Sequence, residues 1–391
     1  MSKIVSITGN DCATQGAALC RPDVIAAYPI TPQSHVVEGL ADLIYNGKLD
    51  SEMVQVESEH SACSVVQGAA AAGGRVFTAT SAQGLALMYE PYFRMSTLRL
   101  PMVMALATRE MTSPETIWSG QQDAMSVRDA GWIQMFCDSN QEILDMIIQG
   151  YMIAEDERIQ IPMNVCYDGF YSSHLVERVE IPDQKDVDEF LPPLAIPAKL
   201  DPNTPQALDP MTPGEYMLHF RKDHLETMKT VLEVLEDVDK KFEEKFGRSY
   251  GGAIEEYRTE DAEVVLLTVG GMTGAGKDAV DLAREEGIKA GLIRIRYVRP
   301  FPAARIAKAL EGKKAFSVVD RSVCFGWSTG PMYMETCAAV ADADDKYCHF
   351  SSIGGLGGAD ISVEHMLDTI KMLEAQKDQP GAKDTNWLMM D

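Results

Sequence analysis

The hydrophobic and polar positions in the first part of the chain, up to about residue 175, follow two alternating periods. Short apolar runs rich in β-branched side chains predict buried strands. The stretches between them repeat apolar residues every three or four positions, as one face of a helix does. The expected strands are 24–27, 53–56, 76–79, 102–107 and 162–166, and the expected helices include 35–45, 61–72 and 141–155. This order predicts a doubly wound α/β domain, in which helices cover a parallel sheet.

A different pattern separates this region from a second one. Prolines recur between residues 179 and 215, which argues against regular elements there. Residues 214–247 then place apolar side chains on one face and charged ones on the other, as in a long amphipathic helix. Buried strands and helices return from about residue 261, and the expected strands there are 263–270, 290–298 and 315–320. We therefore expect two doubly wound domains, at residues 1–178 and 256–391, and a linker with a long helix at 179–255.

The charge balance limits the kinds of partner that the chain can have. The 35 lysines and arginines stand against 59 aspartates and glutamates, a formal net charge of -24. Such a surface repels nucleic-acid phosphates and anionic lipid headgroups. The N-terminus lacks the pattern of a signal peptide, and no apolar run approaches the roughly 20 residues of a membrane span. We expect a cytoplasmic protein that binds neither nucleic acid nor membranes.

The eight cysteines are scattered without any C-x-x-C pair, in segments that otherwise have the pattern of buried structure. We expect free, reduced thiols in the core. An iron–sulfur cluster needs about four clustered thiolates, and a structural zinc needs a comparable set of ligands. We therefore expect no metal site on this chain.

Four segments that follow expected strands carry polar side chains. They lie where the carboxyl ends of parallel strands meet, the edge at which open α/β sheets bind ligands. The loop 28–34 presents the Thr31 hydroxyl between two prolines, and the loop 56–62 carries Glu57 and Glu59. The loop 78–84 is a run of small polar residues, and Arg109 ends the next apolar strand. These loops predict a ligand site at this edge.

Each loop also allows a purely structural explanation. The Thr31 or Ser34 hydroxyl can cap a helix, and a glutamate at a helix start is stabilised by the helix dipole. Only one of the two glutamates is needed for that. A buried arginine can pair with its neighbour Glu110. The residues alone leave both explanations open.

A glycine-rich turn in the second domain resembles part of a phosphate-binding loop. The stretch 271–277, Gly-Met-Thr-Gly-Ala-Gly-Lys, follows an expected strand, but Asp278 stands where a serine or threonine would hold magnesium. A carboxylate there would repel phosphate. A nucleotide-dependent kinase or ATPase is therefore a weaker alternative than a tight turn that allows close backbone packing.

The four loops, in this order and spacing, resemble the pyrimidine-binding domain of the pyruvate:ferredoxin oxidoreductase family. The likeness extends over most of the chain, to residues 131–134, 167–170, 298–302, 320–322 and the Gly-Gly-Leu-Gly-Gly stretch at 354–358. The resemblance implies an α/β fold with two doubly wound domains. One is a thiamine-diphosphate pyrimidine-binding domain, and the other is similar to the transketolase C-terminal domain. It further implies the alpha subunit of a multi-subunit 2-oxoacid:ferredoxin oxidoreductase.

The resemblance also implies roles for residues at the matching positions. Glu59 resembles the catalytic glutamate that hydrogen-bonds N1′ of the thiamine aminopyrimidine, and an apolar surround would raise its pKa towards the working pH. Arg109 resembles the arginine that pairs with the substrate carboxylate, and Thr31 resembles the hydroxyl that orients it. The other residues expected to contact the cofactor are Tyr28, Pro29, Ile30, Ser81 and Gln83.

Some parts of such an enzyme are missing from the chain. It has neither the Gly-Asp-Gly and downstream Asn that hold magnesium and diphosphate in thiamine enzymes nor cluster cysteines. The resemblance therefore implies a beta subunit that binds the diphosphate and Mg²⁺, and [4Fe-4S] clusters on partner subunits only. Ferredoxin is the expected electron acceptor. We expect a dimer of such heteromers.

One departure from the family pattern concerns the substrate. After Trp118 the family usually shows Asp-His-x-Asp, whereas this chain has Ser-Gly-Gln-Gln-Asp at 119–123. The amides of Gln121 and Gln122 would suit a more polar substrate than pyruvate. The main expectation is a pyruvate-type 2-oxoacid converted to acyl-CoA and CO₂. The alternatives are oxalate converted to two CO₂ without CoA, a bulkier 2-oxoacid, or a non-catalytic assembly subunit, which predicts loss of Glu59 or Arg109.

Overall fold

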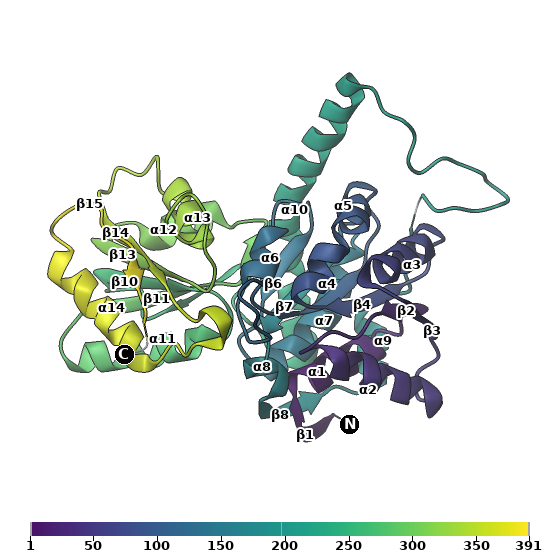
Figure 1. Ribbon diagram of the computed structural model, residues 1–391, viewed down its shortest axis with the longest axis horizontal. Helices are drawn as coiled ribbons and strands as arrows, with labels where there is room; N and C mark the ends of the chain where they lie inside the picture. The colour runs from purple at the N-terminus through teal and green to yellow at the C-terminus, as the bar shows by residue number, and fades with distance from the viewer. Residues whose placement is uncertain (1, 197, 390–391) are drawn as a thin grey trace.

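A seven-stranded sheet forms the centre of the first of two lobes in the computed structural model, which describes residues 2–196 and 198–389 (Figure 1). The order of its strands is β12-β6-β7-β5-β4-β2-β3, and all pairs are parallel except β12 with β6. The strands are β2 (Val24–Ala27), β3 (Glu52–Gln55), β4 (Val76–Thr80), β5 (Val103–Thr108), β6 (Ile133–Phe136), β7 (Met163–Asp168) and β12 (Tyr297–Arg299). The expected doubly wound α/β class is confirmed.

Helices cover both faces of this sheet, because the buried residues of each strand alternate between the faces. One face packs against α1 (Gly9–Leu19), α2 (Ser34–Tyr45) and α7 (Asn140–Ala154). The other packs against α3 (Glu59–Ala71), α4 (Ala82–Leu87) and α5 (Tyr89–Thr97). The remaining elements of this lobe are α6 (Gln122–Ser126), α8 (Tyr171–His174), α9 (Gln184–Phe190) and an antiparallel pair, β1 (Lys3–Thr8) with β8 (Val176–Ile181).

The second lobe is built on another seven-stranded sheet, with β15-β14-β13-β10-β11-β9 in order and β16 beside β14. Its strands are β9 (Ile254–Tyr257), β10 (Val264–Thr268), β11 (Ala290–Ile295), β13 (Ala315–Asp320), β14 (Cys348–Ile353), β15 (Gly381–Ala382) and β16 (Asn386–Trp387). Its α-helices are α11 (Thr273–Glu285), α12 (Ala303–Leu310), α13 (Pro331–Ala339) and α14 (Val363–Gln376), and η1 (Gly270–Met272) and η2 (Leu356–Gly358) are short 3₁₀ turns.

The pattern of the apolar run at 290–298 predicts one strand, but the structure has two strands there. The first part of the run is β11 in the second sheet, and its last part is β12, which pairs antiparallel with β6 in the first sheet. The chain therefore crosses from one sheet to the other within a few residues. This crossing joins the two lobes through backbone hydrogen bonds.

A buried ion cluster lies at the same crossing. Glu142 of α7 is fully buried and accepts hydrogen bonds from Arg296 Nε at 2.9 Å and Nη2 at 2.7 Å, and also from Arg294. Burial alone would raise the pKa of Glu142, but the two guanidinium groups lower it to about 2. The carboxylate therefore stays charged and links α7 of the first lobe to the segment that runs from β11 to β12.

Glu142→Gln is expected to lower the free energy of unfolding by about 3–5 kcal/mol near pH 7, because Arg296 loses its counter-ion and Arg294 keeps only the partly exposed Asp138 and Glu255. Since the pKa of Glu142 is lowered from 4.5 to about 2, its contribution is present above pH 4.5 and is lost as the pH falls through that window. The difference from wild type should therefore narrow between pH 4.5 and 2. Urea unfolding of the purified chain measures it.

Glu236→Gln is the matched control for this prediction, because Glu236 pairs with Arg305 at 3.3 Å on the exposed surface. Such a pair contributes about 0–1 kcal/mol. A Glu142 variant no less stable than this control would contradict the role of the buried cluster.

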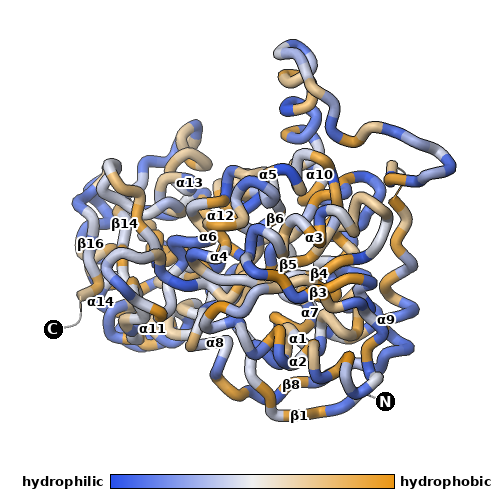
Figure 2. The backbone as a smooth tube through the Cα atoms, turned by 45° about the vertical axis from the view of Figure 1, so that its right-hand side comes forward, coloured by the Kyte–Doolittle hydropathy of each residue, from blue (hydrophilic) through white to orange (hydrophobic). Residues whose placement is uncertain are grey.

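The long amphipathic helix is α10 (Gly214–Phe246), but the first lobe covers only part of its apolar face. Val231, Val238 and Phe242 are buried, whereas Tyr216 and Phe220, on the expected face, are 56% and 59% exposed. The N-terminal part of α10 projects from the body of the molecule, and apolar and polar residues alternate along it (Figure 2). Within the described ranges, neither this helix nor any other has the length and apolar character needed to cross a bilayer.

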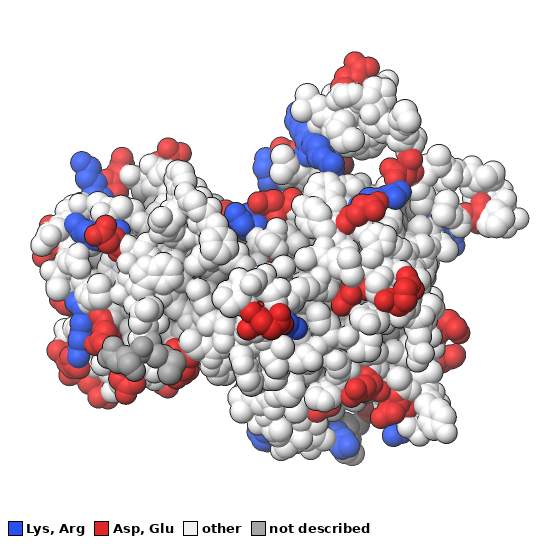
Figure 3. Space-filling view, viewed as in Figure 1, with Lys and Arg blue, Asp and Glu red and all other residues white. Residues whose placement is uncertain are grey.

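Acidic side chains occur over both lobes on the face shown in Figure 3, and basic ones gather along the projecting part of α10. Arg221 and Lys222 of this helix are exposed. The surface thus agrees with the acidic balance of the sequence, and this face has no broad basic tract of the kind that binds nucleic acid.

Candidate active site

The candidate site lies at the carboxyl edge of the first sheet, where the strand order reverses. The chain passes from β2 outward to β3 and then crosses back to β4 on the other side of β2. Helices α2 and α3 accordingly cover opposite faces. Open α/β sheets bind ligands at such a switch point. The loops after β2, β3 and β4 and the end of β5 meet here.

Arg109 extends from the end of β5 and is only 5% exposed. Its Nη1 donates to the Thr31 carbonyl at 2.8 Å, and its Nη2 donates to the Thr116 carbonyl at 3.0 Å. This contact joins the loop after β2 to the end of β5. Burial lowers the pKa of Arg109, although the charges of Glu115 and Asp123 act in the opposite direction.

The expected alternative for Arg109, an ion pair with Glu110, is not formed. The Glu110 carboxyl accepts from the Met111 N–H at 3.2 Å instead. In the part of the chain that the structure describes, no carboxylate pairs with the Arg109 guanidinium within 4.0 Å, so backbone carbonyl oxygens alone accept the hydrogen bonds of its side chain. A buried guanidinium without a counter-ion favours an anionic ligand.

Glu59 is the first residue of α3 and is 6% exposed. It is not needed as a cap, because the Ser58 hydroxyl already accepts from the Ser61 N–H at 3.2 Å. Among residues 2–196 and 198–389, no side chain donates a hydrogen bond to its carboxyl. Burial raises its pKa, and its own backbone N–H offsets only part of this effect. Glu59 is therefore a buried acid that can hold a proton for a ligand.

Gly84 of α4 lies directly against this carboxyl. A Cβ atom at residue 84 would meet Glu59 Oε1 at 2.6 Å and Thr80 Oγ1 at 2.5 Å. Real Cβ atoms do not approach oxygen so closely, and any larger residue would displace the glutamate. A glycine here leaves the space in which the Glu59 side chain sits.

Several buried polar atoms around the loops after β2 and β4 have no hydrogen-bond partner among the residues that the structure describes. They are Gln33 Oε1, Thr80 Oγ1, Ser81 Oγ and Gln83 Oε1. A buried polar atom without a hydrogen bond costs about 1–3 kcal/mol, so each one calls for a reason. Amino groups and ring nitrogens of a bound ligand would supply the missing partners.

Four large apolar residues in these loops or in neighbouring segments of the chain are exposed, and together they are called the rim. Tyr28, Tyr89, Ile117 and Trp118 are each at least 39% exposed. Pro29 is also exposed, and Ile30 is half-buried. Large exposed apolar side chains on several segments of one site favour a surface that another molecule covers.

The side-chain amides of Gln121 and Gln122, which were expected to contact the substrate, bond to the second lobe. Gln121 Nε2 donates to the Val269 carbonyl at 3.2 Å. Gln122 Nε2 donates to the Val323 carbonyl at 3.2 Å, and its Oε1 accepts from the Val323 N–H at 2.9 Å. Both amides are thus bound to the backbone of the second lobe. This finding argues against the expected contact with substrate, and we leave both residues out of the site.

Asp123, which follows them, is the site residue that pattern reasoning missed. It is fully buried, and burial raises its pKa to about 7 despite three backbone N–H donors that lower it. The donors belong to Ala82, Arg109 and Ala124. The only signal in the sequence was an aspartate at the end of the Ser-Gly-Gln-Gln-Asp stretch.

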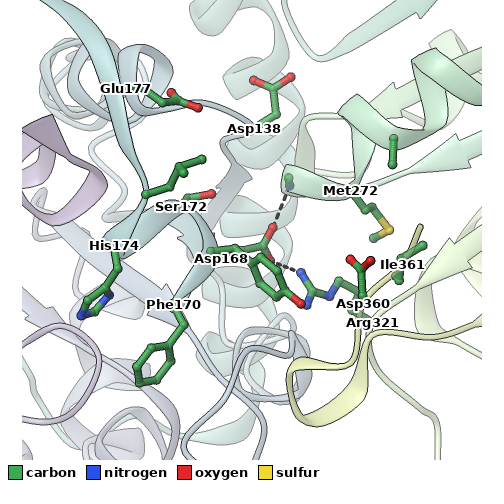
Figure 4. Close-up of a pocket in the computed structure, with 14 residues that line it drawn as sticks. Asp138, Asp168, Phe170, Ser172, His174, Glu177, Met272, Arg321, Asp360 and Ile361 are labelled. Atoms are coloured by element: carbon green, nitrogen blue, oxygen red, sulfur yellow. Dashed lines mark hydrogen bonds and ion pairs between the residues drawn. The ribbon is translucent and has the colours of Figure 1, made fainter. Parts of the chain in front are cut away.

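The glycine-rich turn of the second lobe is closed by a carboxylate. Asp168 Oδ2, at the end of β7, accepts from the Gly271 N–H at 2.7 Å, and Asp168 Oδ1 pairs with Arg321 at 3.1 Å (Figure 4). The adjoining cleft, about 590 Å³, also has the carboxylates of Asp138 and Asp360 on its walls. An acid already occupies the position of a phosphate, so this turn does not suit a nucleotide.

The cysteines lie apart from one another. All eight are free, and six are buried. Within the described residues, no three or more His, Cys, Asp or Glu side chains are grouped so that they could hold a metal ion.

Comparison with protein families matches both lobes. Residues 15–240 match the family described as "Pyruvate flavodoxin/ferredoxin oxidoreductase, thiamine diP-bdg". Residues 262–366 match "Pyruvate:ferredoxin oxidoreductase core domain II". Together the two matches span most of the chain.

Two curated relatives are similar over nearly their whole length. The alpha subunit of an NADH-dependent phenylglyoxylate dehydrogenase from Aromatoleum evansii is 46% identical, over 95% of this chain and 91% of its own. Pyruvate synthase subunit PorA from Methanothermobacter thermautotrophicus is 40% identical, over 94% of each chain.

Two solved structures share the fold. A 2-oxoglutarate:ferredoxin oxidoreductase from Magnetococcus marinus superposes with a TM-score of 0.74 at 21% identity, over 94% of this chain and 65% of that chain. An inactive split-gene transketolase superposes with a TM-score of 0.56 at 9% identity, over 95% of this chain and 100% of that chain. At these identities the likenesses concern the fold alone.

Proposed function

Because this chain belongs to the pyruvate:ferredoxin oxidoreductase family, we propose that it is the alpha subunit of a thiamine-diphosphate-dependent 2-oxoacid:ferredoxin oxidoreductase. In this proposal the chain supplies the half of the site that activates the aminopyrimidine ring and holds the substrate carboxylate. One observation carries it: two buried charged groups lie in loops at the same sheet edge, and among the described residues the Glu59 carboxyl has no side-chain donor and the Arg109 guanidinium has no carboxylate partner.

The residues at this edge fit the pyrimidine end of thiamine diphosphate. Glu59 would hydrogen-bond the ring nitrogen N1′. The unpartnered oxygens of Ser81 and Gln83 would accept from the ring's amino group, and the 28–30 backbone would flank the ring. When bound, thiamine diphosphate supplies the carbon nucleophile and the electron sink that oxidative decarboxylation of a 2-oxoacid requires.

Glu59 acts in this proposal by holding a proton at N1′. Burial raises the pKa of its carboxyl, which keeps a proton available for sharing with a ring nitrogen. The close approach of Gly84 limits the positions that the carboxyl can adopt. A general acid fixed in this way contributes about 10²–10⁴-fold to the rate of a proton transfer.

Gly84→Ala is expected to lower turnover at least about tenfold, because the added methyl group must displace Glu59 or Thr80. Affinity for the cofactor should fall as well, and titration of the cofactor-free complex with thiamine diphosphate measures this separately. Gly68→Ala is the matched control, since a Cβ at this helical glycine meets nothing within 4 Å. Equal activities of the two variants would count against the proposed position of Glu59.

Arg109 and Thr31 act on the substrate. The guanidinium would bind the 2-oxoacid carboxylate through N–H groups directed away from the Thr31 and Thr116 carbonyls, and the Thr31 hydroxyl, which is exposed, would orient it. The substrate carboxylate would thus be the counter-ion of the Arg109 guanidinium, which has no carboxylate partner among the described residues.

For the substrate we propose a small 2-oxoacid of the pyruvate type, as acted on by the PorA relatives named for pyruvate synthase. A second candidate is an aryl 2-oxoacid. It is favoured by the 46% identical phenylglyoxylate dehydrogenase subunit and by a hollow of about 520 Å³ lined by Trp118, Phe170 and Tyr171. Oxalate loses its main support, because the amides of Gln121 and Gln122 are bound to the second lobe.

The remaining parts of the enzyme belong to partners in this proposal. A beta subunit would bring Mg²⁺ and the diphosphate site, and it would cover the rim formed by Tyr28, Tyr89, Ile117 and Trp118. Iron–sulfur-bearing subunits would pass electrons to ferredoxin, in a dimer of heteromers. The cytoplasmic location and the domain limits near residues 178 and 255 stay predictions.

Reduction of ferredoxin or methyl viologen by the natively purified complex tests the proposed function. Pyruvate and phenylglyoxylate are offered with CoA, and oxalate is offered without it. Reduction with pyruvate or phenylglyoxylate supports the proposal and selects the substrate class. Absence of reduction with any 2-oxoacid, despite bound thiamine diphosphate, would favour the non-catalytic assembly subunit.

A further inference from the structure

Asp123 receives hydrogen bonds from two different loops of the site. Its Oδ2 accepts from the Ala82 N–H at 2.8 Å and from the Arg109 N–H at 3.0 Å. Its Oδ1 accepts from the N–H of Ala124 at 2.7 Å. A single carboxylate oxygen thus joins the loop after β4 to the end of β5.

Each of these two loops leads directly to one of the proposed functional groups. On one side, Ala82 begins α4, and two residues later Gly84 lies against the Glu59 carboxyl. Ala82 adopts φ +43°, a conformation that costs free energy for a residue with a Cβ and that its hydrogen bond helps to hold. On the other side, the bonded N–H is that of Arg109 itself.

We propose that Asp123 is a positioning residue that sets the Glu59 carboxyl and the Arg109 guanidinium relative to each other. The roles of Glu59 and Arg109 rest on the proposed function, whereas the hydrogen bonds of Asp123 to the two loops are observed in the structure. A shift of the Asp123 carboxylate would move the wall behind Glu59 and the root of the Arg109 side chain together.

A second buried aspartate in this chain binds the backbone of a single element. Asp320 is also nearly fully buried, and it accepts from the Met332 N–H at 3.0 Å and the Tyr333 N–H at 3.2 Å. Both donors belong to the first turn of one helix, α13. Asp123 differs because, besides its bond to Ala124, it accepts from two separate loops. Asp320 is therefore a matched control for burial and hydrogen bonding without the proposed coupling.

The first test is amide hydrogen exchange in the cofactor-free complex, read at Ala82 and Arg109 in Asp123→Asn and Asp123→Ala. Asparagine keeps the shape but places an NH₂ group against one set of donors. We expect at least about tenfold faster exchange at both amides in each variant, and no change there in Asp320→Asn. Unchanged exchange in Asp123→Asn would overturn the proposal even if Asp123→Ala does not fold.

The second test separates positioning from stability. In the assembled complex with thiamine diphosphate, Asp123→Asn should raise the KM for the 2-oxoacid at least about tenfold. It should also slow hydrogen–deuterium exchange at C2 of the cofactor at least about tenfold, because both functional groups are displaced. Asp320→Asn should change neither. If Asp123→Asn lowers thermal stability but leaves both readouts unchanged, the residue is only structural and the proposal is wrong.

The two tests distinguish this inference from the proposed function. A wild-type complex that reduces no acceptor with any 2-oxoacid contradicts the function, whereas the amide-exchange result still decides whether Asp123 holds the two loops. Fast exchange in Asp123→Asn with unaltered catalysis shows that the loops tolerate displacement, and this also overturns the positioning role.

Discussion

Replacing Glu59 by glutamine is expected to lower 2-oxoacid-dependent ferredoxin reduction by about 10²–10⁴-fold, the range for a lost general acid or base. Glutamine has the same shape, so the space left by Gly84 remains filled and the complex should assemble. It cannot, however, give a proton to a ring nitrogen and take it back. Steady-state kinetics of the purified complex with saturating thiamine diphosphate measure the loss.

Glu57→Gln is the control for this variant. Glu57 precedes the same helix, but its carboxyl is exposed and accepts a hydrogen bond from the Ser61 hydroxyl, which lowers its pKa. Its replacement should change turnover less than about twofold, as for a surface substitution of small effect. Similar losses in the two variants would remove Glu59 from its proposed role.

Arg109→Ala is expected to lower kcat/KM for the 2-oxoacid by roughly 10- to 150-fold, since a hydrogen bond to a charged group contributes about 1.5–3 kcal/mol. Most of the loss should appear in KM if the guanidinium binds substrate and transition state equally. The affinity for thiamine diphosphate should change little. Titration of the cofactor-free complex and steady-state kinetics measure the two effects separately.

Arg109→Lys, measured in the same experiment, separates the effect of the charge from that of the guanidinium geometry. Lysine keeps the charge but loses the planar fork, which donates to the Thr31 and Thr116 carbonyls and, in the proposed role, also to the substrate carboxylate. We expect an intermediate loss. If Arg109→Ala binds the substrate as well as wild type, another residue holds the carboxylate.

The buried strands of the first sheet could be predicted because their apolar runs are local signals. Strands β2, β3, β4, β5 and β7 lie within two residues of the expected ranges. Strand β6 was not among the expected strands, because the polar Gln134, which is buried in the structure, interrupts its apolar run. The pairing of β1 with β8 joins segments far apart in the sequence, which no local pattern reports.

The crossing between the two sheets could not be predicted either, because it depends on residues far apart in the sequence. The run at 290–298 contains Arg294 and Arg296, which in a continuous strand would be hard to bury. Their counter-ion, Glu142, is about 150 residues away in the chain. Without that contact, the pattern favoured one strand where the structure has two.

Some residues of the candidate site could likewise be predicted from the sequence, and others could not. Glu59, Thr31 and Arg109 could be selected because a parallel sheet brings the ends of its strands to one edge, whatever the details of packing. The actual position of Gln121 and Gln122 could not be predicted, because it depends on the second lobe's backbone at Val269 and Val323. The contacts of Asp123 likewise come from two loops that are separated in the sequence.

Hydrogen–deuterium exchange at C2 of thiamine diphosphate, bound to the native complex, tests the central claim most directly. Acid quenching followed by NMR compares wild type with Glu59→Gln, without the need for substrate, ferredoxin or the correct 2-oxoacid. The account predicts fast exchange in wild type and exchange slowed by at least about 100-fold in Glu59→Gln. Equal exchange rates in the two proteins, with the cofactor bound to both, would contradict the claim that this chain activates the cofactor through Glu59.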